Sequence, residues 1–148
     1  ANESDLEHSC IAVVRAGTEG TEEARVITDY DISTKKVTLS SELVNHGSYT
    51  ANETIFYSLY GFRREGFISQ NIGTTKTKFL LDHTKTKIPR STTYNDVFKN
   101  VELHITEGTG AGSSETISDY DAVSGQVTID TPFSVTLDDT SKYRLGPA

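Results

Sequence analysis

The chain has 148 residues, of which 34% are hydrophobic and 24% are charged, and its net charge is −7. This length suits one domain or two small ones. The negative charge argues against nucleic acid as a partner, because phosphate binding needs a basic face. The one cysteine excludes an internal disulfide. No apolar run approaches the roughly 18 residues of a membrane span, so we expect no membrane partner either.

The first half of the chain predicts short β-strands separated by turns. Runs rich in β-branched and aromatic residues are typical of strands, and they occupy residues 10–15, 25–30, 37–39 and 54–60. Residues 31–35 (Asp-Ile-Ser-Thr-Lys) predict a tight turn, because Asp and Ser side chains bond nearby backbone amides. The charged residues 61–66 are the best domain boundary, and we expect one unit over residues 1–60 and another over residues 61–148.

The second half predicts further strands, at residues 67–72, 76–81, 101–106, 115–120, 127–129 and 141–145. Val101, Leu103 and Ile105 alternate with polar residues, so we expect them to face inward. Residues 95–100 predict one short helical turn, and no longer helical period appears. The sequence therefore predicts an all-β protein of two related small antiparallel β units, barrel- or sandwich-like, with hairpins joining the strands.

One pattern occurs in both units. Residues 17–39 read GTEGTEEARVITDYDISTKKVTL, and residues 108–129 read GTGAGSSETISDYDAVSGQVTI. The correspondence extends outward, since residues 12–16 match 103–107 and residues 54–59 match 140–145. A repeat of this kind predicts one supersecondary unit that is used twice.

The two units differ at their beginnings. Residues 67–93 form an opening arm of the second unit, with one or two strands, and the first unit has no such arm. A missing strand leaves an edge of bare N–H and C=O groups, which proteins normally cover. We therefore expect the first unit to lack its opening strands, and another chain to cover it by strand addition or close packing. A truncated unit that stays monomeric is the alternative.

Two Asp-Tyr-Asp segments are the candidates for a divalent ion, through Asp29, Asp31, Asp119 and Asp121. Calcium takes six to eight oxygen ligands, and this spacing does not match a helix–loop–helix calcium loop. We expect these carboxylates to cap the following turns and predict no metal site. Tyr30 and Tyr120, between the carboxylates, should pack in the core with their hydroxyls at the surface.

Catalytic and phosphate-binding motifs are absent from the sequence. The glycine-rich residues 108–112 lack the Lys and the following helix of a phosphate loop, and they predict a hairpin loop. No motif links any histidine to a nucleophile; the histidines are His8, His46, His83 and His104. We therefore expect no enzyme and no cofactor, although a triad or a carboxylate pair assembled from distant positions is the alternative. A sugar platform could use Tyr49, Tyr57 and Tyr60.

Charge is distributed unevenly along the chain. Seven basic residues lie between Arg63 and Arg90, against the acidic Glu65 and Asp82. A basic middle between acidic ends is the pattern expected if the middle of one subunit meets the ends of another. A solvated basic face is the alternative.

The order of motifs in the second unit resembles a repeat of tailed-bacteriophage virion proteins. The matching pieces are Gly73-Thr74, residues 77–81, Tyr94-Asn95, residues 108–112, residues 117–121, Val127-Thr128 and residues 138–145. The first unit matches from about Ser4 to Leu59, less the arm, and departs from the pattern at Glu19, Thr21 and Glu22. The resemblance implies a structural component of tails, fibres, necks or head surfaces, with no enzymatic activity to transfer.

These observations together lead us to expect a non-enzymatic structural component of a tailed phage virion, made in the host cytoplasm. It would assemble by β-rich packing with copies of itself, as a homo-oligomer, and with neighbouring virion proteins. A receptor- or glycan-binding decoration or fibre module is the alternative. A hydrolase would need a pocket in which a His meets a Ser or two carboxylates meet.

Overall fold

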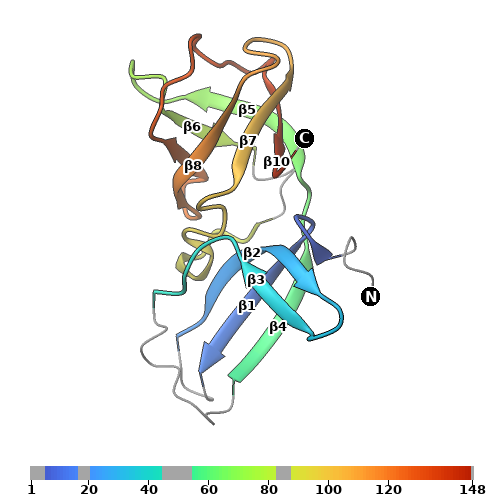
Figure 1. Cartoon of the computed structure of the whole chain (residues 1–148). Helices are drawn as coiled ribbons and strands as arrows, with labels where there is room; N and C mark the ends of the chain where they lie inside the picture. The colour runs from blue at the N-terminus through green and yellow to red at the C-terminus, as the bar shows by residue number, and fades with distance from the viewer. Residues whose placement is uncertain (1–5, 17–20, 45–54, 83–87, 148) are drawn as a thin grey trace.

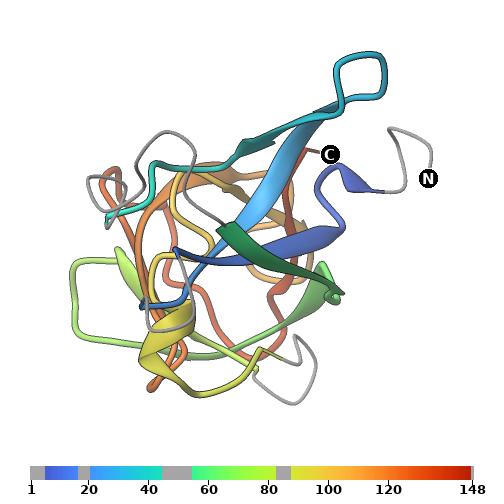
Figure 2. The ribbon, with the colours of Figure 1, turned by 90° about the horizontal axis from the view of Figure 1, so that it is seen from below.

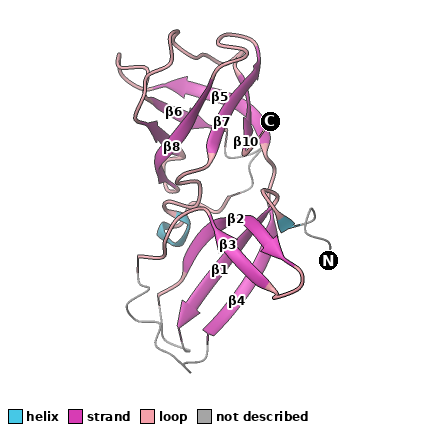
Figure 3. Cartoon of the chain, in the orientation of Figure 1, coloured by secondary structure: helices cyan, strands magenta, loops and turns pink. Residues whose placement is uncertain are grey.

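The computed structural model describes residues 6–16, 21–44, 55–82 and 88–147, and every structural statement below concerns these residues. It confirms the all-β prediction (Figures 1 and 3). The elements are β1 (Cys10–Ala16), β2 (Glu23–Asp31), β3 (Lys36–Leu39), β4 (Ile55–Gly61), β5 (Glu65–Asn71), β6 (Lys78–Leu81), the 3-10 turn η2 (Thr92–Tyr94), β7 (Glu102–Glu107), β8 (Ser114–Asp121), β9 (Gln126–Ile129) and β10 (Lys142–Leu145). The helical turn therefore falls earlier than the predicted residues 95–100.

The second unit is a closed barrel in which every neighbouring pair is antiparallel. Its strand order is β10-β5-β6-β9-β8-β7, and β7 pairs back with β10. Val101, Leu103 and Ile105 are buried, as their alternation predicts. Closure removes free sheet edges, so this unit satisfies its own backbone hydrogen bonds.

The first unit is an open antiparallel sheet in the order β3-β2-β1-β4. By the sequence correspondence, these strands are the counterparts of β9, β8, β7 and β10. Among the described residues nothing corresponds to β5 and β6, so β3 and β4 each pair with one strand only. The prediction that the first unit lacks its opening strands is thus confirmed.

The duplication extends to the pairing register. Ile27 pairs with Leu39 as Ile117 pairs with Ile129, and both ladders shift register directly before the first Asp of the Asp-Tyr-Asp segment. The β1–β4 pairing likewise repeats that of β7–β10, except that only β7–β10 has a bulge, between Lys142 and Tyr143. Side chains at equivalent positions therefore project from the same face of the sheet in the two units.

One face of the open sheet packs against the second unit. Ile11, Val13, Ala24 and Val26 belong to the same hydrophobic core cluster as Phe98 and its neighbours. The Val26 amide donates to the carbonyl of Val97 at 3.1 Å. In Figure 1 the segment around η2 lies between the barrel and the open sheet, and Figure 2 shows the open sheet in front of the barrel when the molecule is seen from below. The two units therefore share a core, and among the described residues the opposite face of the sheet packs against neither unit.

Candidate binding site on the open face of the first unit

A pocket of about 520 Å³ lies on the uncovered face of the first sheet. Alternate residues of its strands line the pocket, because successive side chains of a strand point to opposite faces. The lining is apolar apart from Lys35 and the Tyr hydroxyls; it comprises Leu6, Ala12, Val14, Tyr30, Lys35, Val37, Leu39, Leu43, Ile55, Tyr57 and Leu59. We call this set of residues the open face.

The open face is the counterpart of the barrel interior. Tyr57 and Leu59 are 71% and 42% exposed, whereas the equivalent Tyr143 and Leu145 are both 0% exposed. In the barrel, Ile68 of β5, together with Phe79 and Leu81 of β6, joins these residues in the core cluster. The difference in exposure therefore follows from the two strands that the first unit lacks.

The β4 edge is unusually apolar. All its residues are exposed, and its sequence is Ile-Phe-Tyr-Ser-Leu-Tyr-Gly. The equivalent β10 alternates buried Tyr143 and Leu145 with Lys142 and Arg144. Native proteins normally blunt such an edge with charge, Pro or a covering segment. An exposed apolar edge of this kind is typical of a surface that another chain covers.

The pairing register shows where the backbone amides at the open edges point. In the barrel, the Ile129 amide donates to Thr77 at 2.9 Å, and the Leu145 amide donates to Arg64 at 2.8 Å. Leu39 and Leu59 occupy the same register positions in the first unit. Their N–H groups therefore point away from the sheet, where an added strand would accept from them.

Among the described residues, Lys35 is the one charged residue that lines the open face. It ends the β2–β3 turn with a positive φ of 57°, where the barrel has Gly125 with a φ of 78°. Lys36 follows it as the first residue of β3. In the barrel, the end of β6 lies at this corner, because the carbonyl of Gly125 accepts from the Leu81 amide at 3.0 Å. Lys35 and Lys36 make the corresponding corner of the open face cationic.

The predicted metal candidates do not form an ion site. Asp31 caps its turn: its Oδ1 accepts from the amides of Ser33 at 2.8 Å and Thr34 at 3.2 Å. The hydrogen bond from the Ser33 hydroxyl, together with the bonds from Thr34 and the amides, lowers the pKa of Asp31 to about 2. Asp121 caps the equivalent turn in the barrel, with amide bonds from Val123 at 2.9 Å and Ser124 at 3.2 Å.

The first carboxylates of the two segments lie elsewhere. Asp29 and Asp119 are both exposed. Partial desolvation, then a hydrogen bond and the negative charge of Asp96, raise the pKa of Asp119. Within the described ranges, no three His, Cys, Asp or Glu side chains converge as a metal ion would require.

The tyrosines between these carboxylates correct one prediction. Tyr120 is 1% exposed, and its hydroxyl is buried without a hydrogen-bond partner among the described residues. The surface hydroxyl predicted for Tyr120 is therefore wrong, because barrel closure encloses the whole side chain. Tyr30 is half-buried at the open face.

The glycine-rich loop is a hairpin connection between β7 and β8, as the sequence predicts. Gly108, Gly110 and Gly112 all have positive φ, which suits glycine. A side chain at Gly108 would collide with the backbone of Thr140. The Gly112 amide donates to the Ile105 carbonyl at 2.8 Å, so the loop closes on the barrel.

Of the four histidines, His8 and His104 lie among the described residues, on different segments. His104 lies in β7, with its Nε2 3.4 Å from a Glu102 oxygen. His8 precedes β1 and donates its amide to Ile27 at 2.7 Å. His46 and His83 lie outside the described residues, as does Tyr49.

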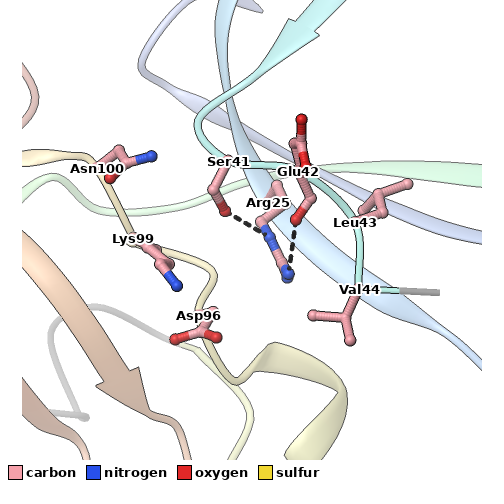
Figure 4. A pocket seen from close by; sticks show the side chains of 8 residues that line it. All are labelled: Arg25, Ser41, Glu42, Leu43, Val44, Asp96, Lys99 and Asn100. Carbon is pink, nitrogen blue, oxygen red and sulfur yellow. Dashed lines mark hydrogen bonds between the residues drawn. The ribbon is translucent and has the colours of Figure 1, made fainter. Parts of the chain in front are cut away.

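A second cleft, of about 380 Å³, surrounds Arg25 (Figure 4). Arg25 is 2% exposed; its Nε donates to Ser41 at 2.8 Å and its guanidinium to the carbonyls of Glu42 at 3.2 Å and Asn95 at 3.3 Å. The carboxylate of Glu23 lies 3.7 Å away. Through these contacts the guanidinium joins the first unit to the second, so we assign the cleft a structural role.

Part of the basic middle is bound within the second unit. Arg64 donates to the carbonyls of Leu145 and Pro147, each at 2.7 Å. Arg144 pairs with Glu65 at 2.9 Å, an interaction that lowers the pKa of Glu65. A contact between the basic middle of one subunit and the acidic ends of another stays a prediction.

The sequence does not predict the open-face residues as a site. The signal that could have found them is β4 itself, because Phe56-Tyr57-Ser58-Leu59 stands where β10 has Lys142-Tyr143-Arg144-Leu145. Loss of the alternating charges shows that the two strands face different surroundings. Of the open-face residues, the sequence predicts a binding role for Tyr57 alone, as part of a sugar platform with Tyr49 and Tyr60.

Comparison of the chain with family models, with curated proteins and with solved structures finds no match. The described residues contain no helix that is long and apolar enough to cross a membrane. No family is therefore assigned, and function must be argued from the site.

Proposed function

We propose that the chain is a non-enzymatic structural component of a tailed phage virion that assembles through the open face. One observation carries the assembly part: the same register gives a closed barrel in one unit and an uncovered apolar sheet in the other. Burial of exposed apolar surface of this kind would stabilise an assembly by about 25 cal/mol per Å². The virion part rests on the motif order in residues 66–145.

The chemistry of the open face favours a protein partner over a glycan. Sugar sites need several convergent polar groups around an aromatic platform, whereas this lining is mainly aliphatic. Tyr57 and Tyr60 are an odd number of residues apart on one strand, so they point to opposite faces. Of the two, Tyr57 alone lines the open face, which weakens the receptor- or glycan-binding alternative at that face.

The virion assignment is tested by mass spectrometry of purified particles. We expect the particles to contain the chain at a fixed copy number. We also expect the chain to stay bound during high-salt washing. Leu59→Asp places a charge on the open face and should reduce incorporation strongly. Val123→Asp is the matched control, because Val123 is 50% exposed in the second unit, away from the open face. Absence of the wild-type chain from particles would refute the proposal.

Self-association is tested by sedimentation velocity over a range of concentrations. The wild-type chain should form oligomers whose population falls with Leu59→Asp and is unchanged by Val123→Asp. A wild-type monomer at the highest concentration would argue against the homo-oligomer. Binding of a glycan that Tyr57→Ala abolishes would favour the alternative function.

A further inference from the structure

We infer that the open face receives a two-stranded antiparallel arm from a neighbouring protein, which inserts between β3 and β4 and completes a second barrel. The inference rests on the proposed function and names the partner of its site. The sister unit supplies the template. There, β5 and β6 fill the interval between β10 and β9, which are the counterparts of β4 and β3. The gap in the first unit is therefore two strands wide.

The template also specifies the side chains of the arm. A Cβ at Gly66 would lie 2.6 Å from the hydroxyl of Tyr143, and Gly66 pairs with Tyr143 in the register. Tyr57 occupies the position of Tyr143, so the first strand of the arm needs Gly opposite Tyr57. Ile68 lies two residues after Gly66 and is 0% exposed, which specifies an aliphatic residue there.

The second strand of the arm follows from β6. Phe79 pairs with Val127, the counterpart of Val37, and is fully buried. Leu81 follows on the same face. The second strand should therefore read aromatic-x-aliphatic, with the aromatic residue opposite Val37. This pattern alternates with residues that would face solvent, as in a half-buried strand.

Charge gives the arm a further requirement. The second strand would end beside Lys35 and Lys36, since Leu81 ends β6 beside Gly125 and Leu80 pairs with Gln126 in the barrel. An acidic residue at that end would form a charge-assisted contact. The chain's own arm has Asp82 directly after Leu81.

A second copy of the chain is a poorer donor of the arm than a different protein. Its arm, β5–β6, already closes its own barrel, and donating it would expose Ile68 and Phe79. Two open faces packed together, which is the self-association proposed for the chain without its partner, would bury apolar surface but would leave the outward amides of Leu39 and Leu59 unpaired. Unpaired backbone groups in a buried interface are costly. A partner's arm satisfies both the apolar face and the edges.

The test uses a synthetic peptide of residues 64–82, the chain's own arm, added to the full chain. We expect one peptide per chain and a slowing of amide exchange at Leu39 and Leu59 by about tenfold or more. Leu59→Asp in the chain should abolish both effects, and Val123→Asp should leave them unchanged. A peptide carrying Ile68→Asp and Phe79→Asp should not bind. Binding that is insensitive to Leu59→Asp would mean exchange into the barrel and would contradict the inference.

A fused arm keeps the test decisive if the free peptide fails to bind. A copy of residues 64–93 is joined before residue 1 of the full chain, where the arm stands relative to β7 in the second unit. We expect a higher melting temperature, slower exchange at Leu39 and Leu59, and loss of self-association. The same fusion with Ile68→Asp and Phe79→Asp in the added copy is the control. If the intact fusion behaves like its control, the inference is overturned, while incorporation into particles would still support the proposed function.

Discussion

Truncation of two equivalent tyrosines gives the sharpest test of the difference between the units. Tyr57 and Tyr143 occupy the same register position, yet Tyr57 is 71% exposed and Tyr143 is 0% exposed. Tyr143→Ala should destabilise the chain by about 3–5 kcal/mol, the usual cost of removing a buried aromatic ring. Tyr57→Ala should change stability by about 0.5 kcal/mol or less, as at other exposed sites.

The assay is urea unfolding at low protein concentration, which limits self-association. Fluorescence and circular dichroism are followed together, so that a transition of one unit alone is recognised. If Tyr143→Ala does not fold, Tyr143→Leu supplies a milder truncation at the same site. Equal losses for Tyr57→Ala and Tyr143→Ala would refute the reasoning, because they would mean that Tyr57 is already covered in the free molecule. In assembled protein the ranking should change, since Tyr57→Ala should then weaken the assembly.

Three further predictions concern the interior and the turns. Gly66→Ala should cost about 1–3 kcal/mol through overpacking against Tyr143, and Tyr143→Phe should reduce that cost in a double-mutant cycle, whereas additive losses would exclude the contact. Arg25→Ala should cost about 3–5 kcal/mol of stability by leaving Glu23 without its buried counter-charge. In unfolding measurements, the stability lost by the double variant with Glu23→Ala should be less than the sum of the two single losses. An Arg25→Ala variant of unchanged stability would contradict the joining role. The pKa of Asp31 is lowered to about 2, so the turn's stabilisation should be present above pH 4 and lost as the pH falls through about 2; an NMR titration of the carboxyl carbon with a midpoint near 4 would be the contrary result.

The sequence predicted the features that depend on local chemistry. Asp31 and Asp121 each precede a polar turn, and the structure gives both the same amide bonds. The alternation of Leu103 and Ile105 with polar residues fixed the inward face of β7. Such patterns lie within a few residues of chain, so periodicity and turn preference suffice to find them.

Features that depend on distant partners could not be predicted in the same way. Arg25 alternates with apolar residues in a strand, which is typical of a solvent-facing position, yet its guanidinium reaches the Asn95 carbonyl in the other unit. Tyr120 looks amphipathic, but closure of the barrel buries its hydroxyl. Neither outcome follows from the residues nearby, because both depend on how the two units pack together.

The composition of β4 is the strongest argument that the open face is covered in the working assembly. A solvent-facing edge strand is stable against aggregation when charge or Pro interrupts it, and β3 has Lys36 at its start. The described β4 has neither, although it presents Ile55, Tyr57 and Leu59 on the open face. In the barrel the same face is buried by β5 and β6. A strand with this composition is suited to being covered on the open face, because Tyr57 and Leu59 match the buried Tyr143 and Leu145 of β10 yet lie at an exposed edge.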